Sequence, residues 1–376
     1  MLMFKNILTI GWEVFCILVA HLSNKSLVNL AEPVGRQELL NLRDSENFYC
    51  PGCHSEMVLK LGEIKIPHFA HKSLSTCDDF SEPESALHLQ GKILLHQFFK
   101  DKNFSIELEK YLPEIRQRAD LLINGQTAIE YQCSPISANQ VIKRSNGYHQ
   151  IGIQSLWLGG IKLSIKEQIQ IIRLKNFEHE LLQQKHKNPF LLSFRPEDNR
   201  FIYFSNLFYV SGSRRIGKVK SLPAEKQCYP FAVPKQLTKA EFRLVCLLFS
   251  QTRQTFIRNQ LFAKNRMKNP FWRSCYKLQL DMKKLPETIG IPFIKAGCIL
   301  QHAVLWQLQA ISASEEGKSM SSLIHSGEIP LAHPSCFTEA ERLLEEYVEI
   351  FLLLKGQEEN FTSLIDLLYD NYCNNV

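Results

Sequence analysis

One turn signal constrains the fold of this chain more than any other feature. The dipeptide Asn124-Gly125 separates two apolar runs, residues 119–123 and 128–133, and Asn-Gly is the strongest short signal for a tight β-hairpin. Each run carries one carboxylate, Asp120 in the first and Glu130 in the second. Carboxylates among apolar strand neighbours are costly unless a cation pairs with them. We therefore expect paired strands whose two acidic side chains share a hard divalent metal, Mg²⁺ or Mn²⁺.

A surface hairpin with polar outward positions explains the same two residues equally well, so the flanking segments decide. Residues 84–100 place apolar side chains at helical spacing, and residues 104–108 resemble a strand. After the hairpin, residues 137–148 predict a helix and residues 155–158 a strand. The order helix, three strands, helix, strand indicates a mixed α/β core and favours the site.

The helix predicted upstream carries three polar residues four apart, Glu84, His88 and Lys92. This spacing puts them on one face of the helix, beside its apolar stripe. Glu84 could add a metal ligand, and His88 or Lys92 could contact a phosphate. An ordinary solvated helix face explains the pattern almost as well.

A second candidate metal site precedes that helix. Cys50 and Cys53 flank a Pro-Gly turn, and His68 and His71 follow as an HxxH pair. Two thiolates and two imidazoles suit a tetrahedral structural Zn²⁺ in a module too small to build a large core. The histidine assignment is open, because Cys77 could replace His68, and a metal-free module with one structural histidine is the simpler alternative.

The length of 376 residues indicates several domains. We divide the chain into a start-site extension (1–16), a zinc-binding-like module (17–80), the core (81–162) and a C-terminal region (163–376). Residues 17–29 predict two short strands around a turn. Lys5 and Glu13 interrupt the apolar N-terminal stretch, so we expect no stable membrane insertion. The eleven cysteines do not form a disulfide pattern, which favours a reducing, cytoplasmic compartment.

The C-terminal region is predicted to be mainly helical. Residues 164–182, 238–262 and 338–354 each combine a capping-box pattern with apolar periodicity. Between Arg214 and Lys284, seventeen Lys or Arg residues stand against three acidic ones, and residues 339–370 are acidic. Aromatic residues interleave with the basic stretch, which suits single-stranded DNA. Ordinary helices with solvated lysines and buried aromatics fit as well.

Several motifs together resemble those of the CoiA family of competence proteins. They are FYCPGC, PHFAH, ESALHLQGK, RADLLI and AIEYQCSPIS, within residues 17–160. The resemblance implies a multidomain α/β fold: a small zinc-ribbon-like N-terminal module, a restriction-endonuclease-like core of the PD-(D/E)XK type, and a mostly α-helical C-terminal region.

The resemblance also implies roles for individual residues. Asp120 and Glu130 would be the metal ligands, and Glu84 the helix carboxylate. Gln132 stands where the motif usually has a lysine, a position that Lys92 or Lys143 could supply from a helix. The expected DNA contacts, taken together, are His88, Arg118, Lys143 and Arg144.

The implied function is a metal-dependent nuclease that processes DNA during natural transformation and recombination. Its expected partners are DNA, single-stranded in particular, and recombination proteins. The alternative is a factor that binds DNA or a recombination partner and keeps the nuclease fold without cutting. Cys133 invites a nucleophile interpretation, but a free cysteine in an apolar strand is more often a small buried hydrophobe.

Overall fold

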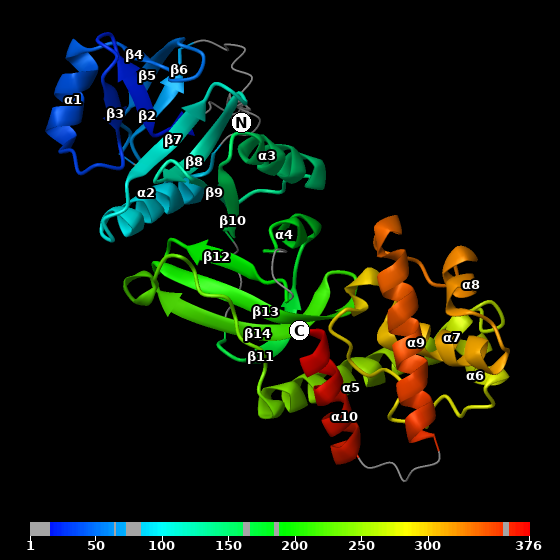
Figure 1. Cartoon of the computed structure of the whole chain (residues 1–376). Coiled ribbons are helices and arrows are strands. Elements are labelled where there is room, and N and C mark those ends of the chain that lie inside the picture. Colours follow the sequence, from blue (N-terminus) through cyan, green and yellow to red (C-terminus); the bar gives the residue numbers. More distant parts are fainter. Residues whose placement is uncertain (1–15, 64, 73–83, 161–165, 184–187, 356–360) are drawn as a thin grey trace, which may run out of the picture. The chain divides into compact units, whose positions relative to one another are not determined.

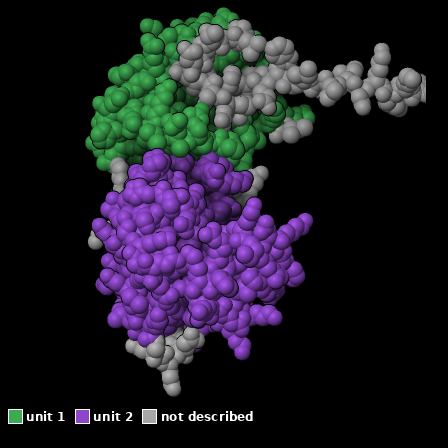
Figure 2. Space-filling model, turned by 90° about the vertical axis from the view of Figure 1, so that its right-hand side faces the viewer, with its two compact units in different colours: residues 1–163, 193–201, 222–227 green, residues 164–192, 202–221, 228–376 purple. Residues whose placement is uncertain are grey.

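The computed structural model describes residues 16–63, 65–72, 84–160, 166–183, 188–355 and 361–376. Two compact units make up the chain (Figure 2). The first unit consists of residues 1–163, 193–201 and 222–227, and the second of residues 164–192, 202–221 and 228–376. Of the predicted start-site extension, only Cys16 lies within the described residues, where it begins the first strand.

The first unit opens with a small antiparallel sheet and one helix (Figure 1). The strand order is β1-β6-β5-β4-β2-β3. The elements are β1 (Cys16–Ile17), β2 (Val19–Leu22), β3 (Leu27–Asn29), α1 (Arg36–Ser45), β4 (Phe48–Tyr49), β5 (Glu56–Lys60) and β6 (His68–His71). Phe48 and Phe69 pack in its core at a ring-centroid distance of 5.0 Å. The two strands predicted within residues 17–29 are confirmed as β2 and β3.

The core of the first unit follows the predicted order. It consists of α2 (Ala86–Lys100), β7 (Ile106–Leu112), β8 (Gln117–Ile123), β9 (Thr127–Gln132), α3 (Ala138–Gln150) and β10 (Gln154–Gly159). The hairpin is confirmed, because Asn124 and Gly125 both have positive φ, 50° and 65°, as a tight β-hairpin turn requires. β10 then runs parallel to β9 along its whole length.

The helices α2 and α3 cover opposite faces of this sheet. Neighbouring residues of a strand point to opposite faces, and β9 shows this at two successive positions. Tyr131 lies against Gly91 of α2, whereas the Tyr148 hydroxyl of α3 donates a hydrogen bond to Glu130. Ser137 caps α3 in a full capping box with Gln140, which fixes where the helix begins.

The second unit contains most of four further strands and a helical part. The strands are β11 (Ile169–Arg173), β12 (Leu191–Arg195), β13 (Arg200–Ser211) and β14 (Arg214–Pro223), and α4 (Asn176–Glu180) follows β11. They belong to one eight-stranded sheet of order β11-β14-β13-β12-β10-β9-β8-β7, in which Gly159 of β10 pairs with Ser193 of β12 within the first unit. The ends of β12 and β13 around residues 193–201 belong to the first unit. Among the described residues, 3-10 turns lie at Ala296–Cys298 and Pro334–Cys336 in this unit and at Ala224–Lys226 in the first.

The prediction of a long helix over residues 164–182 is wrong. Ile169, Ile171 and Ile172 fit helical spacing, but β-branched residues also favour strands, and antiparallel pairing of β11 with β14 decides the outcome. The mainly helical C-terminal region therefore begins at Lys239 and not at residue 163. Its helices are α5 (Lys239–Leu261), α6 (Pro270–Lys277), α7 (Ala303–Glu315), α8 (Met320–His325), α9 (Phe337–Leu354) and α10 (Phe361–Asn375).

The capping boxes predicted for the later helices have different outcomes. Thr238 and Glu241 form one at the start of α5, as expected. At α9 the helix begins one residue before Thr338, and Cys336 at the cap makes no side-chain bond. Ser164 lies outside the described residues. Within the described part of the chain, every helix is too short or too polar to cross a membrane.

The contact of α2 with the sheet gives a first prediction. A Cβ at Gly91 would lie 2.1 Å from a carbon of the buried Tyr131 ring, so Gly91→Ala must displace the ring or the helix. We expect the free energy of unfolding to fall by about 1–3 kcal/mol, measured by urea denaturation. Gly62→Ala is the control, because the nearest atom to its added Cβ, the backbone nitrogen of Lys65, would lie 3.8 Å away. Equal stability of the two variants would contradict the packing described.

Candidate active site and metal centres

The helix α2 brings three predicted site residues to the sheet. Ser85 caps the helix by accepting a hydrogen bond from the backbone N–H of His88 at 3.2 Å, so Glu84 immediately precedes the cap. His88 and Lys92 lie one turn apart on the same face. Both reach Asp120 of β8: His88 Nε2 is 3.5 Å from Oδ2, and Lys92 Nζ is 3.9 Å from Oδ1. The predicted common face is thus confirmed, and it faces the sheet.

Asp120 lies where the strands β8 and β9 separate. The last paired residues before it are Leu121 and Ile129. At the next position, the side-chain carboxylate of Asp120 accepts a hydrogen bond from the backbone N–H of Tyr131 at 2.9 Å. One ligand atom each from Glu84, His88 and Asp120 lies within 4.8 Å of the others. These three residues form the acid cluster of the protein.

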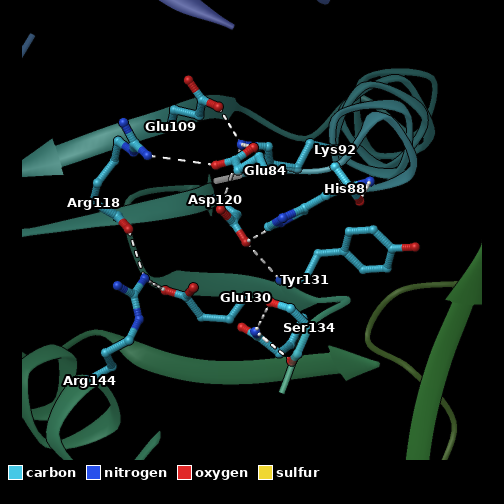
Figure 3. Close-up of polar contacts among 12 residues, drawn as sticks. Glu84, His88, Lys92, Glu109, Arg118, Asp120, Glu130, Tyr131, Ser134 and Arg144 are labelled. Carbon is cyan, nitrogen blue, oxygen red and sulfur yellow. Dashed lines mark hydrogen bonds and ion pairs between the residues drawn. The ribbon is translucent and has the colours of Figure 1, made fainter. Parts of the chain in front are cut away.

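Lys92 provides the positive charge beside the acid cluster. Its side chain is fully buried, with Nζ 2.5 Å from Glu84 and in contact with Glu109 (Figure 3). Burial alone would lower the pKa of Lys92, but the charges of Glu109, Glu84 and Asp120 together raise it above its usual value. Lys92 is therefore a permanent ammonium ion.

The charge of Asp120 is fixed in the same way. Burial favours its neutral form, but the contact with His88 and the charge of Lys92 hold the pKa of Asp120 well below its usual value. For His88, burial lowers the pKa, and the charges of Glu84 and Asp120 outweigh this and raise it. The cluster thus keeps a full negative charge on Asp120.

Glu109 is a member of the site that the sequence did not reveal. One carboxylate oxygen of Glu109 accepts a hydrogen bond from Lys92 Nζ. The other accepts a hydrogen bond from the backbone N–H of Leu18 at 2.8 Å. Glu109 therefore ties the N-terminal sheet to the lysine of the acid cluster. It adopts a positive φ of 49°, which turns its side chain inward from β7. The sequence shows a glutamate within a predicted strand, but no sequence pattern predicts the positive φ that turns its side chain inward.

Glu130 is turned toward α3 and away from the acid cluster (Figure 3). Its Oε1 accepts hydrogen bonds from Arg144 at 2.5 Å and from the Tyr148 hydroxyl. Burial raises the pKa of Glu130, the charge of Arg144 works against this rise, and the charge of Asp120 adds to it. The two hairpin carboxylates therefore influence each other's charge but bind different helices. The role of Glu130 as a metal ligand stays a prediction.

The remaining predicted residues of the core have separate positions. Gln132 donates hydrogen bonds to the carbonyl and hydroxyl oxygens of Ser134, at 2.9 and 3.1 Å. Arg118 lies at the acid cluster, 3.7 Å from Glu84, whereas Lys143 is exposed on α3. Burial raises the pKa of Cys133 to about 12, so this cysteine is a neutral thiol, in line with the non-nucleophilic interpretation.

The donor atoms of the acid cluster fit a divalent cation. Two of these atoms already have ionic neighbours: Glu84 Oε2 lies 2.5 Å from Lys92 Nζ, and His88 Nε2 lies 3.5 Å from Asp120 Oδ2. Two carboxylates and one imidazole are a common ligand set for Mn²⁺. Mg²⁺ would bind mainly through the carboxylate oxygens of this set.

The second cluster consists of Cys50, Cys53 and His71, whose ligand atoms also lie within 4.8 Å of one another. Burial raises the pKa of Cys50, and backbone hydrogen bonds from Cys53 and Gly52 counteract the rise. Burial, helped by the charge of Arg118, lowers the pKa of His71. The neutral imidazole is the form of histidine that binds a metal, whereas the two cysteines must lose their protons to bind one.

His68 stands apart from this cluster. His68 and His71 are three residues apart on the strand β6, and an odd separation puts side chains on opposite faces of a strand. His68 Nδ1 instead contacts the carbonyl oxygen of Ile66 at 2.8 Å. An HxxH pair lies on one face only in a helix, and β6 is a strand. Cys77, the other candidate, lies outside the described residues.

Comparison with known families agrees with this architecture. The family description "Competence protein CoiA, nuclease-like domain" matches residues 84–236, which include the whole acid cluster. "Competence protein CoiA, N-terminal domain" matches residues 31–80, which include the cysteine cluster. The chain is thus a multidomain α/β protein with a nuclease-like domain.

The particular family follows from both matches and from one curated relative. The competence protein CoiA of Bacillus subtilis (strain 168) is 31% identical over 198 residues, 51% of this chain and 52% of the relative. The chain belongs to the CoiA family of competence proteins. It matches about half the length of that relative. No solved structure matches the chain.

The buried lysine gives a prediction on stability. Lys92→Met leaves Glu84, Glu109 and Asp120 without their buried cation, so we expect a loss of about 3–5 kcal/mol in the free energy of unfolding. Lys100→Met on the same helix is the matched control, because Lys100 is half exposed and pairs with Glu32 at the surface. That variant should lose less than about 1 kcal/mol. Comparable losses by urea denaturation would contradict the role given to Lys92.

Proposed function

We propose that the chain is a metal-dependent nuclease of the PD-(D/E)XK type that acts on DNA. One observation carries the proposal: one ligand atom each from Glu84, His88 and Asp120 lies within 4.8 Å of the others, beside the buried ammonium of Lys92. Two carboxylates and one imidazole at this separation are a ligand set suited to a divalent cation. The match to a nuclease-like domain supports the same chemistry.

Each residue of the acid cluster has a definable part in such a reaction. A bound Mg²⁺ or Mn²⁺ would polarise a phosphodiester and lower the pKa of a water molecule. Glu84 and Asp120 would hold the ion, with His88 as a third ligand. Lys92, permanently charged, would neutralise the carboxylates and offset negative charge that develops on the phosphate. In this proposal Lys92 replaces the motif's usual lysine, since Gln132 is bound to Ser134.

The residues on the α3 side have a supporting part. Arg144 donates to Glu130 at 2.5 Å and to the carbonyl oxygen of Arg118 at 2.9 Å, so it holds β8 and β9 together next to Asp120. We propose Glu130 as the residue that positions Arg144, and as a further ligand in the metal-bound state. Arg118 and the exposed Lys143 would contact the phosphates of DNA together with Arg144.

The biological setting comes from the family. The relative in Bacillus subtilis is named a competence protein, so we propose that this chain processes DNA during natural transformation and recombination. Single-stranded DNA is its proposed substrate, recombination proteins are its proposed partners, and the cytoplasm is its proposed compartment.

Cleavage gives the direct test. Asp120→Asn removes one negative ligand, and we expect it to abolish Mg²⁺- or Mn²⁺-dependent cutting of single- and double-stranded DNA. Asp101→Asn, at the exposed end of α2, is the control and should cut as the unaltered chain does. Thermal melting would establish that both variants fold. Unchanged cleavage by Asp120→Asn would refute the site, and no cleavage by the unaltered chain with either metal would refute the activity.

One observation favours a second function, DNA binding without cleavage. Lys92 already compensates the carboxylates of Glu84, Glu109 and Asp120, so the cluster can exist as a purely structural ion network. This alternative predicts salt-dependent DNA binding that Asp120→Asn leaves unchanged, with no cutting under any metal condition.

We further propose that Cys50, Cys53 and His71 hold a structural Zn²⁺. The support is the proximity of three soft or borderline ligand atoms and the Pro51-Gly52 turn between the cysteines. Cys77 is the sequence-based candidate for the fourth ligand. With protein ligands alone, such a site would stabilise the sheet and take no part in chemistry.

Substitution of each histidine of β6 tests whether the cysteine cluster binds zinc. His71→Ala should lower the zinc content of the purified chain well below one equivalent, whereas His68→Ala should keep it, because His68 is bonded to Ile66. Elemental analysis by mass spectrometry gives the stoichiometry. Retention of zinc by His71→Ala, or its loss from His68→Ala alone, would overturn the assignment.

A further inference from the structure

The second unit contains the longest stretch of the described chain without an acidic residue. Between Glu241 and Asp281 the sequence has eight basic residues and no carboxylate. One of the eight, Arg253, is buried and donates to the carbonyl oxygens of Ile289 and Leu285, so its role is structural. The others lie on or near the surface and leave a strongly cationic segment.

The structure divides the aromatic residues of this segment into two groups. Phe271 is buried, and Phe256 packs on the ring of His302 at 4.3 Å. In contrast, Phe262 is 80% exposed and Tyr276 is 87% exposed. Exposed aromatic side chains of this degree are unusual, because burial of each ring would be favourable. Met267, in the same segment, is 86% exposed.

The helix α6 presents its aromatic and basic residues on one side. Phe271, Ser274 and Cys275 are buried against the helical core. Trp272 is half-buried against the core, and Arg273, Tyr276 and Lys277 are exposed. Because Trp272 and Tyr276 are four residues apart, they lie one turn from each other on the same face.

The end of α5 and the loop before α6 are held against that face. Trp272 Nε1 donates to the carbonyl oxygen of Gln260 in α5 at 2.9 Å, and Asn269, the N-cap of α6, donates to the Gln260 side chain at 2.9 Å. The guanidinium of Arg266 lies 4.4 Å from the centre of the Trp272 ring. The loop and α6 therefore form one preorganised surface, which we call the basic-aromatic surface. Its members are Arg258, Phe262, Lys264, Arg266, Met267, Lys268, Trp272, Arg273, Tyr276 and Lys277.

Most of the charge on this surface is uncompensated. In the part of the chain that the structure describes, Lys277 pairs with Glu316 at 2.6 Å, while Arg258, Lys264, Lys268 and Arg273 form no ion pair. A small hollow of about 40 Å³ borders the surface, and its wall contains Arg273, Ser274, Gln309, Glu316 and Glu328. The Gln309 side chain is buried, and its Oε1 has no hydrogen-bond partner among the described residues.

We propose that the basic-aromatic surface binds single-stranded DNA. Four uncompensated cations suit a phosphate backbone, and exposed rings suit stacking of unpaired bases, which a duplex keeps internal. The surface lies beyond residue 236, where the match to the nuclease-like domain ends, so it is a site separate from the acid cluster. The choice of DNA as the polymer rests on the proposed function, whereas the preference for single strands comes from the exposed rings.

The first test measures binding of a fluorescent oligo-dT by anisotropy. The full chain is used without divalent metal and with EDTA, so that cleavage takes no part. Because one base stacked on an aromatic ring is worth about 1–3 kcal/mol, we expect Tyr276→Ala and Phe262→Ala each to lose roughly 5- to 150-fold in affinity. Tyr276→Phe keeps the ring and should bind as the unaltered chain does. Leu300→Ala, which removes another exposed apolar side chain of the second unit, is the matched control and should have no effect.

The second test measures the salt dependence of the same binding. Removing two phosphate contacts by Lys264→Gln with Lys268→Gln should make the slope of log K against log salt shallower by about 1.4 for a single strand. The matched control replaces Lys220 and Lys235, which are exposed elsewhere in the second unit, and should leave the slope unchanged.

The outcomes of these tests are independent of cleavage. Normal binding by Tyr276→Ala and an unchanged slope for the Lys264 and Lys268 variant would overturn the inference, even if the unaltered chain cuts DNA. A duplex of equal length bound as tightly as oligo-dT would also overturn it. Surface-dependent binding without any cutting would support the inference and refute only the proposed nuclease activity.

Discussion

The nuclease-like core depends on one buried ion, the ammonium group of Lys92. It lies between three carboxylates that come from different elements: Glu84 before α2, Glu109 on β7 and Asp120 on β8. Buried charges are tolerated only when they are paired, so the helix and both strands must keep this arrangement. The second oxygen of Glu109 binds the backbone N–H of Leu18, which extends the constraint to the N-terminal sheet. The acid cluster is thus formed in advance, before any ligand binds.

This arrangement divides the two carboxylates of the hairpin. Asp120 is held by α2 in its charged form, whereas Glu130 is held by α3 through Arg144 and Tyr148. The two candidate metal centres also influence each other through Arg118. Its guanidinium lies 3.7 Å from Glu84, and its charge helps to keep His71 of the cysteine cluster neutral.

The sequence predicted those parts of the structure that local patterns determine. The Asn124-Gly125 turn, the order of helices and strands in the core, and the common face of His88 and Lys92 all follow from short-range rules. Contacts set by tertiary packing were not predictable in the same way. The Ile169–Arg173 segment became a strand because β14 pairs with it, His68 left the cysteine cluster because β6 is a strand, and Glu109 entered the site through its positive φ. The sequence placed aromatics in the basic stretch, but only the fold separates Phe271 in the core from Tyr276 at the surface.

The central claim is that Glu84, His88 and Asp120 together bind a divalent cation. Crystals of the full chain soaked in Mn²⁺ and measured at a wavelength where manganese scatters anomalously would test it most directly. The account predicts an anomalous peak among the side chains of these three residues. A map with no peak there, with Lys92 still bound to Glu84, would contradict it and leave the cluster as a structural ion network.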